Sequence, residues 1–171
     1  MLLRLINNIL DLSRLEADKV TLTPEDCDVV QLCRQALSSV EMSRRESGNR
    51  FVFETKIDSF VLQVDVQRLQ QVLINLLTNA AKFTKNGTIT LQFEVDREKK
   101  RVLFAVADTG CGIPKEKQKQ VFERFEKLNE YAQGTGLGLS ICKLTVDKWG
   151  GSIWIDPDYE RGARFVVSHP L

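Results

Sequence analysis

Hydrophobic residues recur at helical spacing over residues 66–84, in the stretch VQRLQQVLINLLTNAAKFT. Asp65 stands just ahead of this stretch, where its carboxylate can accept hydrogen bonds from the free N–H groups of a helix start. The pattern predicts an amphipathic helix whose apolar face lies in the core. That face is expected to consist of Leu69, Val72, Leu73, Leu76, Leu77 and Ala80.

The polar side of this helix carries Asn75, Asn79 and Lys82, which are spaced four and then three residues apart and so point in nearly the same direction. A stripe that only faces water usually holds better helix formers than Asn, whose amide competes for backbone groups. Two amides followed by a lysine favour a site with fixed oxygen ligands, of the kind that Mg²⁺ prefers. A solvent-facing stripe remains the alternative.

The rest of the chain alternates between helical and strand patterns. Further helices are expected over residues 29–47, 115–120 and 137–148. Strands are expected over residues 51–57, 61–64, 88–96, 101–108, 152–156 and 163–169. Residues 22–28 contain Pro24 and are expected to be a connection. Helices on one face of a mixed, mainly antiparallel sheet make this an α+β fold, an α/β sandwich with three helices.

The first 17 residues have a heptad pattern of their own. Leu2, Leu5, Ile9 and Leu12 form its seam, which Leu3, Ile6 and Leu10 widen. One interpretation is an ordinary amphipathic helix that packs on its own domain. The breadth of the face favours the other, half of a helical hairpin. We therefore expect residues 1–20 to be the C-terminal part of a partial coiled-coil helix and residues 21–171 to be a separate domain.

Composition limits the function classes. The chain has 171 residues, 43% hydrophobic content, 27% charged content and a formal net charge of +1. This balance gives no electrostatic reason to expect nucleic acid or an anionic membrane as a partner. No apolar run reaches the length of a membrane span, and the N-terminus does not resemble a signal peptide. The cysteines are expected to be reduced and mostly buried, as in a cytoplasmic protein; they are Cys27, Cys33, Cys111 and Cys142.

Two glycine clusters carry candidate chemistry. Asp108 ends a predicted strand and is followed by Gly110 and Gly112, which let the backbone pass close to a flat ligand. A second cluster opens the helix at 137–148, and helix starts attract anions; it consists of Gly134, Gly136 and Gly138. Either cluster alone could be a tight turn, and neither is a Walker loop.

Four motifs in this order resemble the ATP-binding catalytic domain of bacterial sensor histidine kinases, which share the Bergerat fold with DNA gyrase and heat-shock chaperone ATPases. NLLTNAAKFT is similar to the N box, DTGCGIP to the first glycine box, FERF to the F box and GTGLGLSI to the second glycine box. LINNILDLSRLEADK resembles the end of the dimerisation hairpin. Ala163 departs from the pattern, because many members have Thr there.

The resemblance implies that ATP and Mg²⁺ are the ligands. Asp108 would bind the adenine amino group, Asn79 would ligate Mg²⁺ with Asn75 beside it, and Lys82 would hold phosphate oxygens. Arg124 or Lys127 would reach the γ-phosphate. The glycines from 134 to 138 would form a lid hinge and phosphate cradle. The other nucleotide contacts implied are Phe83, Gly110, Gly112, Ile113, Gly134, Thr135, Gly136, Leu137 and Gly138.

The family's phosphoryl acceptor is a histidine on the first hairpin helix, and this chain has a single histidine, His169. We interpret His169 as a solvent-edge residue, since VVSHPL does not match the acceptor motif. The chain is thus expected to transfer phosphate to a hairpin supplied by the parent protein, and from there to a response regulator. The chain is expected to be cytoplasmic, in a parent protein that is free or anchored in the inner membrane. The alternatives are a clamp ATPase, a scaffold that binds nucleotide without catalysis, and a related serine-kinase regulator.

Overall fold

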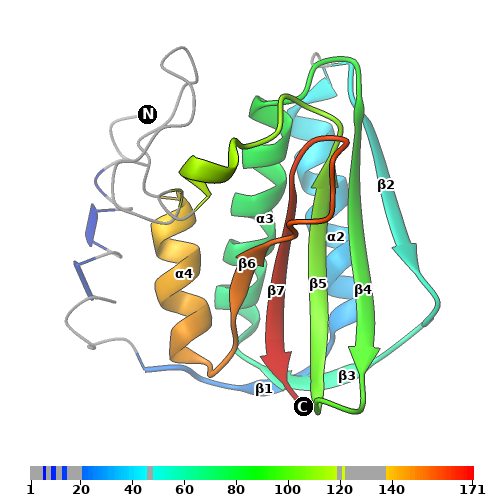
Figure 1. Ribbon diagram of the computed structural model, residues 1–171. Coiled ribbons are helices and arrows are strands. Elements are labelled where there is room, and N and C mark those ends of the chain that lie inside the picture. The colour runs from blue at the N-terminus through cyan, green and yellow to red at the C-terminus, as the bar shows by residue number, and fades with distance from the viewer. Residues whose placement is uncertain are drawn as a thin grey trace.

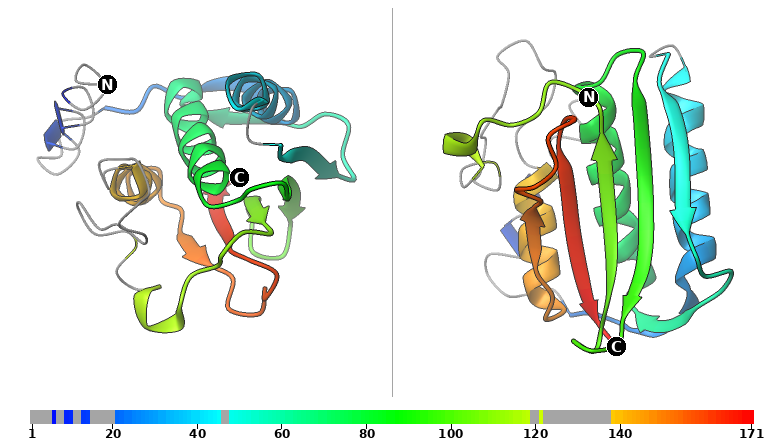
Figure 2. Two further views of the ribbon diagram at one scale, coloured as in Figure 1. Left: turned by 90° about the horizontal axis from the view of Figure 1, so that it is seen from above. Right: turned by 45° about the vertical axis from the view of Figure 1, so that its right-hand side comes forward.

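The computed structural model describes residues 6, 9–10, 13–14, 21–45, 48–118, 121 and 138–171. One layer of helices covers one face of a five-stranded sheet (Figures 1 and 2). The helices are α2 (Val29–Ser43), α3 (Val66–Lys82) and α4 (Gly138–Lys148). None of the described helices is both long enough and apolar enough to cross a bilayer.

The main sheet has the strand order β2-β4-β5-β7-β6. Strand β2 pairs parallel with β4, and the other three pairs are antiparallel. This confirms the predicted mixed, mainly antiparallel sheet and the α+β class. The strands are β2 (Arg50–Thr55), β4 (Thr88–Asp96), β5 (Arg101–Asp108), β6 (Ile153–Ile155) and β7 (Arg164–Pro170).

The β4–β5 hairpin has the bounds that the sequence predicts. On β4, the side chains of Ile89, Leu91 and Phe93 are buried and alternate with more exposed polar residues. This alternation of period two fixes which face of the strand meets the helices. The charged turn REKK closes through Lys100, whose φ of 53° is the left-handed conformation that tight turns require.

Helix α3 forms the centre of the core. All six apolar residues predicted for its inner face are buried. Asp65 caps its start as predicted, since the carboxylate accepts a hydrogen bond from the Arg68 N–H at 3.2 Å. The helix ends at Lys82, and Phe83 is its C-cap. Helix α3 packs between α2 and α4 (Figure 2), and its inner face lies against the inner strands β4 and β5.

A second, two-stranded sheet was not predicted. Strand β1 (Glu25–Asp28) lies in the stretch expected to be a connection, and it pairs antiparallel with β3 (Val61–Val64). The strands at 51–57 and 61–64 are therefore adjacent in sequence but belong to different sheets. Asp28 fixes the turn between these two strands, because its carboxylate accepts hydrogen bonds from the Phe60 N–H and from the Ser59 Oγ hydroxyl. The sequence EDCD of β1 has no apolar alternation that would reveal a strand.

Some predicted boundaries were too long. Helix α2 ends at Ser43 and not at 47, and Asp28 caps its start as predicted. The short helix after Pro114 is a 3₁₀ turn, Lys115–Lys117, instead of a helix to residue 120. Of the N-terminal heptad, the described positions 6, 9, 10, 13 and 14 are helical, and Ile6, Ile9 and Leu10 are exposed. The other heptad residues lie outside the described part of the chain.

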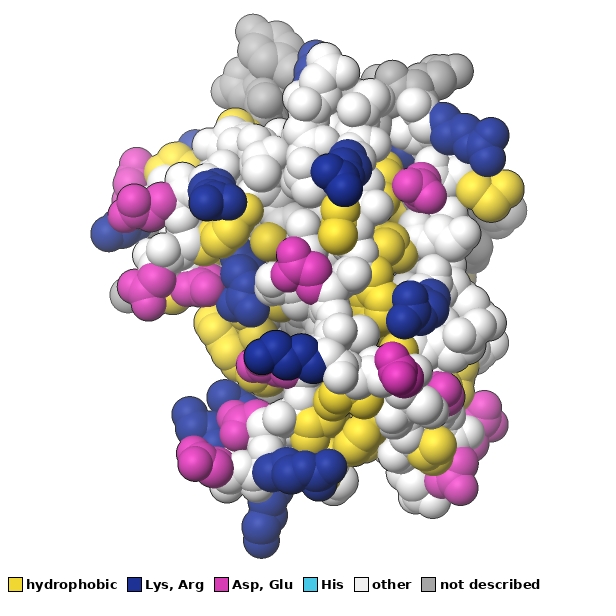
Figure 3. Space-filling view, turned by 90° about the vertical axis from the view of Figure 1, so that its right-hand side faces the viewer, with side chains coloured by type: hydrophobic (Ala, Val, Ile, Leu, Met, Phe, Trp, Pro, Cys, Tyr) yellow, Lys and Arg dark blue, Asp and Glu magenta, His cyan; other side chains and the backbone are white. Residues whose placement is uncertain are grey.

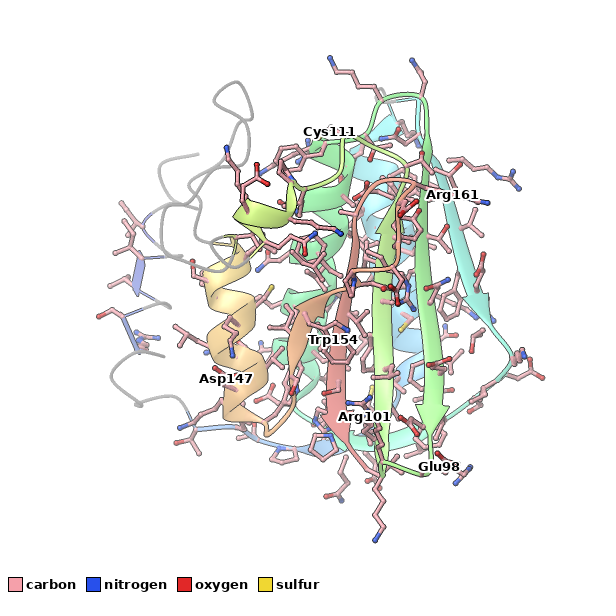
Figure 4. All side chains as sticks on the ribbon, in the orientation of Figure 1. Glu98, Arg101, Cys111, Asp147, Trp154 and Arg161 are labelled. Carbon is pink, nitrogen blue, oxygen red and sulfur yellow. The ribbon has the colours of Figure 1, made fainter. Side chains whose placement is uncertain are left out.

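Two expectations about single residues were wrong. His169 is not at the solvent edge: only 8% of it is exposed, and its ring centroid lies 5.1 Å from that of Trp149. The cysteines are not mostly buried either, because Cys111 is exposed and Cys27 is half-buried. Cys111 is exposed since it lies in a loop above the sheet, where Figure 4 labels it.

The β2 edge of the sheet carries charges of both signs (Figure 3). Seen from the β2 side, acidic and basic side chains alternate with small apolar areas (Figure 3). The guanidinium of Arg34 on α2 lies 5.0 Å over the ring of Phe53 on β2. Charged side chains along an edge strand oppose pairing with another chain.

Candidate nucleotide-binding site

A small pocket lies where the end of α3, the end of β5 and the start of β7 meet. Its lining residues come from segments far apart in the sequence, which the sheet topology brings together. The pocket is lined by Asn79, Phe83, Asp108, Gly112, Ile113, Ala163 and Phe165. The first five of these were proposed as site residues from the sequence.

Asp108 is the polar centre of this pocket. It is the last residue of β5, and only 4% of it is exposed. Its Oδ1 accepts hydrogen bonds from the N–H groups of Gly110 at 2.9 Å and Ala163 at 3.1 Å. Burial raises the pKa of the Asp108 carboxyl, against the opposing effect of these two hydrogen bonds. Within the described residues the bonds to the carboxylate fall on Oδ1, which leaves Oδ2 for a donor on a ligand.

The loop after Asp108 lies directly on the end of α3. The Cys111 N–H donates to the Phe83 carbonyl at 3.4 Å. A Cβ on Gly110 would collide with that same carbonyl, so only glycine fits at this approach. Gly112 has a φ of +71°, which side-chain-bearing residues rarely adopt. These two glycines therefore keep the loop close to Phe83 and leave the pocket open beside it.

The polar stripe of α3 divides into two parts. Asn79 lines the pocket and is half-buried, whereas Lys82 is exposed in the last helical turn. Asn75 lies one turn earlier, beside the start of α4, where its Cγ is 4.0 Å from the position of a Cβ on Gly138.

The thiol of Cys142 lies at the same interface between α3 and α4. It lies 3.9 Å from the Val72 carbonyl and shares a hydrogen bond with the Asn75 side chain. Burial raises the pKa of the Cys142 thiol to about 12, so the thiol is neutral. Asn75 thus contacts α4, while Asn79 faces the pocket.

Several predicted site residues fall outside the described residues. They are Arg124, Lys127, Gly134, Thr135, Gly136 and Leu137. Of the second glycine box, Gly138 is described and is the first residue of α4.

Sequence reasoning missed the contribution of the β6–β7 loop. Ala163 appeared in the sequence only as a departure from the family pattern, and Gly162 was not singled out. A Cβ on Gly162 would collide with the carbonyl oxygen of Asp108 and with Oδ1 of the Asp108 side chain. The only signal was the glycine before the last strand, because pairing between β5 and β7 does not follow from periodicity alone.

The donor set fits a phosphate-bound Mg²⁺ better than a metal held by the protein alone. Among the described residues, no group of three or more His, Cys, Asp or Glu side chains could hold a metal ion. The half-buried Asn79 amide offers one oxygen ligand beside the pocket. Mg²⁺ commonly takes one or two protein ligands and completes its shell with phosphate oxygens and water.

Three helices on a mixed sheet, with a buried carboxylate at the end of a central strand, are the architecture of an ATPase family that includes histidine kinases. The chain belongs to this family, described as "Histidine kinase-, DNA gyrase B-, and HSP90-like ATPase", which matches residues 64–171. This membership confirms the recognition from the four motifs and makes ATP the ligand of the domain.

Among relatives, the chain is 39% identical to the circadian input-output histidine kinase CikA of Synechococcus elongatus, over 99% of the chain and 23% of CikA. Among solved structures, full-length ShkA in complex with AMPPNP gives a TM-score of 0.86 at 30% identity, over 99% of this chain and 35% of ShkA. The catalytic domain of histidine kinase ThkA gives a TM-score of 0.77 at 32% identity, over 87% of this chain and 96% of that domain.

ThkA has also been solved in complex with the response regulator protein TrrA, with a TM-score of 0.80 at 30% identity over 99% of this chain and 48% of ThkA. The chain spans only 12% to 29% of the length of the curated relatives it matches. It corresponds to the catalytic ATP-binding part of such proteins.

Proposed function

We propose that this chain transfers the γ-phosphoryl group of ATP to a histidine on a dimerisation hairpin of its parent sensor kinase. The observation that carries the proposal is the buried carboxylate of Asp108, whose Oδ1 is saturated by two backbone N–H groups. A carboxylate held in this way recognises the exocyclic amine of adenine through Oδ2. Phe83, Gly112 and Ile113 line the pocket beside it and would contact the purine ring.

The phosphates would extend from this pocket along the polar stripe of α3. Asn79 would hold Mg²⁺, which when bound neutralises charge on the phosphate oxygens. Lys82 would contact phosphate oxygens, and Asn75 would support the metal or its waters from its place beside α4. From the motifs, Arg124 or Lys127 would reach the γ-phosphate, and the glycines from 134 to 138 would cradle it.

Two residues bear on which group receives the γ-phosphoryl. Asn75 stands one turn before the proposed metal ligand, where clamp ATPases of this fold have a Glu that activates water. An amide cannot accept that proton. His169 is buried against Trp149, and its Nδ1 lies 2.7 Å from the Pro170 carbonyl. Its imidazole is therefore not exposed in a way that would let it attack the γ-phosphate.

The proposed partners follow from the same interpretation. The N-terminal segment, in which the described residues 6, 9, 10, 13 and 14 are helical, would be the end of the second hairpin helix, which is supported by the exposure of Ile6, Ile9 and Leu10. A response regulator would take the phosphoryl group from the hairpin; the similar kinase ThkA has been solved in complex with a response regulator protein, TrrA. We place this chemistry in the cytoplasm, with the parent protein free or anchored in the inner membrane.

The test uses the full 171-residue chain with Mg²⁺ and γ-labelled ATP, with and without a hairpin peptide that carries an acceptor histidine. We expect ATP binding with little turnover by the chain alone, and acid-labile label on the hairpin when it is present. The Asp108→Asn variant should label the hairpin more weakly at ATP concentrations that do not saturate the parent chain. Acid-labile label on the chain itself, absent in His169→Ala, would contradict the proposal. Steady phosphate release without a hairpin would favour a clamp ATPase, and binding without any transfer would favour a scaffold.

A further inference from the structure

The β6–β7 loop, residues 156–163, holds the main chain of Asp108 as well as its side chain. The Asp108 N–H donates to the Ala163 carbonyl at 2.9 Å. The phenol of Tyr159 donates to the Asp108 carbonyl at 2.7 Å. Together with the two bonds to Oδ1, these contacts engage every polar atom of Asp108 except Oδ2. Figure 1 shows this loop crossing the upper end of β5.

The loop is itself fixed by Asp156. The carboxylate of Asp156 accepts hydrogen bonds from the Asp158 N–H at 2.9 Å and from Nη1 of Arg164 at 3.0 Å. The Asp156 N–H donates to the Arg164 carbonyl at 2.8 Å. Nε of Arg164 then donates to Gln92 on β4 at 2.9 Å. Tyr159 therefore projects from a loop that is anchored to the sheet on both sides.

The phenol is suited to act as a donor. Tyr159 is half-buried, and burial and the nearby Asp108 carboxylate raise the pKa of its hydroxyl, which stays protonated at neutral pH. Nothing in the four family motifs points to Tyr159, which lies between the glycine box and the last strand.

We infer that Tyr159 is a positioning residue for purine recognition, which holds the end of β5 so that Asp108 Oδ2 faces the amino group of adenine. This rests on the proposed function, because it assumes that Asp108 binds that amine. The hydrogen bond from the Tyr159 phenol to the Asp108 carbonyl limits rotation of the last peptide group of β5. A carboxylate that is oriented before binding loses less entropy when the ligand arrives. Tyr159 thus acts through Asp108 and does not itself touch the base.

The test is a cycle between the Tyr159→Phe variant and removal of the ligand's amino group. Affinities for ATP and for purine riboside triphosphate, which lacks the 6-amino group, are measured by calorimetry on the full chain. Tyr159→Phe should weaken ATP binding about threefold to tenfold and leave the purine analogue unchanged. Faster amide exchange of Ala163 N–H should accompany this loss. Glu160→Gln, an exposed neighbour in the same loop, is the matched control and should change neither affinity.

A purely structural role predicts a different result. Tyr159→Phe would then lower thermal stability but change both affinities equally, or not at all, and either outcome would overturn the inference. Asp108→Asn, measured with the same two ligands, separates this from the proposed function. Suppose that Asp108→Asn abolishes the preference for ATP over purine riboside triphosphate and that Tyr159→Phe leaves this preference unchanged. The proposed recognition of adenine by Asp108 then stands, and only the role of Tyr159 is wrong. If Asp108→Asn leaves the preference intact, the proposed recognition of adenine is wrong and the inference falls with it.

Discussion

Asp108 and Ala163 bind each other twice: the Asp108 N–H donates to the Ala163 carbonyl at 2.9 Å, and the Ala163 N–H donates to Asp108 Oδ1 at 3.1 Å. The first bond continues the pairing of β5 with β7, and the second orients a side chain. The contacts that assemble the sheet therefore also aim the carboxylate proposed to select the ligand.

Asp108→Asn should weaken ATP binding by about 1–3 kcal/mol, because a charge-assisted hydrogen bond becomes an ordinary or repulsive contact. The fold should persist, since the Asn oxygen can still accept from Gly110 and Ala163. Calorimetric titration with ATP measures the effect. Asp147→Asn, which removes an exposed carboxylate on α4, is the control and should bind normally. Equal affinity in the two variants would remove Asp108 from the site.

The same variant should be more stable than the parent chain at neutral pH. Burial raises the pKa of Asp108 above its ordinary value of 3.8, so the folded state binds this proton more tightly than the unfolded state does. That contribution is complete below pH 3.8 and is lost as the pH rises through the folded pKa. Scanning calorimetry should thus show a higher melting temperature for Asp108→Asn at pH 7.5, with a smaller gain near pH 4. A lower melting temperature at pH 7.5 would contradict this.

Asn79→Ala should abolish the Mg²⁺-dependent part of nucleotide binding and spare most of the affinity measured in EDTA. Helix stability should if anything improve, because Ala is the better helix former. Titrations with and without Mg²⁺ measure the difference. Asn75→Ala gives a contrasting variant that should melt at a lower temperature, because the contact with Cys142 at the α3–α4 interface is lost. Normal Mg²⁺·ATP affinity in a destabilised Asn79→Ala would make Asn79 structural.

Thr145→Val should stabilise the protein. The Thr145 side chain is fully buried in α4, and its hydroxyl has no hydrogen-bond partner among the residues that the structure describes. An unsatisfied buried hydroxyl costs about 1–3 kcal/mol, which the isosteric methyl group removes. A gain of about 1 kcal/mol should raise the melting temperature by about 2–4 °C. Thr145→Ser keeps the hydroxyl and deletes the methyl group, and it should destabilise. A loss of stability in Thr145→Val would show that the hydroxyl is satisfied.

Stability should also fall in mild acid because of His169. Burial lowers the pKa of its imidazole, against a smaller effect of the hydrogen bond to Pro170, so the unfolded state binds the proton more tightly. The contribution of neutral His169 is present above its ordinary pKa of 6.5 and is lost as the pH falls toward the folded pKa. Urea unfolding between pH 5 and 8 should show this slope, and His169→Gln should flatten it. An equal slope in both proteins would exclude His169 as its source.

The sequence predicted the parts of the fold that have a clear period. Helix α3, the β4–β5 hairpin and the core face of α3 follow from spacing alone, because burial of one face repeats every 3.6 or 2 residues. Strand β1 was missed, since EDCD is polar and its pairing with β3 depends on a turn fixed by Asp28. The burial of His169 was missed because the contact with Trp149 joins residues from different elements.

The site was predictable only where one motif supplies both the residue and its neighbours. Asp108, Gly110 and Gly112 lie together in the sequence, and Asn79 lies in the last turn of α3, four residues before its C-cap Phe83. Tyr159 and Gly162 reach Asp108 only because β7 pairs beside β5 in the sheet. No local pattern records that pairing, so their part in the site becomes visible only in three dimensions.

The capping carboxylate of α3 has a consequence for how the domain responds to force. Asp65 Oδ2 also accepts a hydrogen bond from the Thr23 N–H at 3.0 Å, so the segment that enters the domain is fastened to the start of that helix. Asn79 and Phe83 lie at the other end of the same helix, about 21 Å and about 27 Å along its axis from Asp65 at about 1.5 Å per residue. A pull or twist on the segment at Thr23 therefore acts on the start of α3, and the other end of that helix forms one wall of the nucleotide pocket.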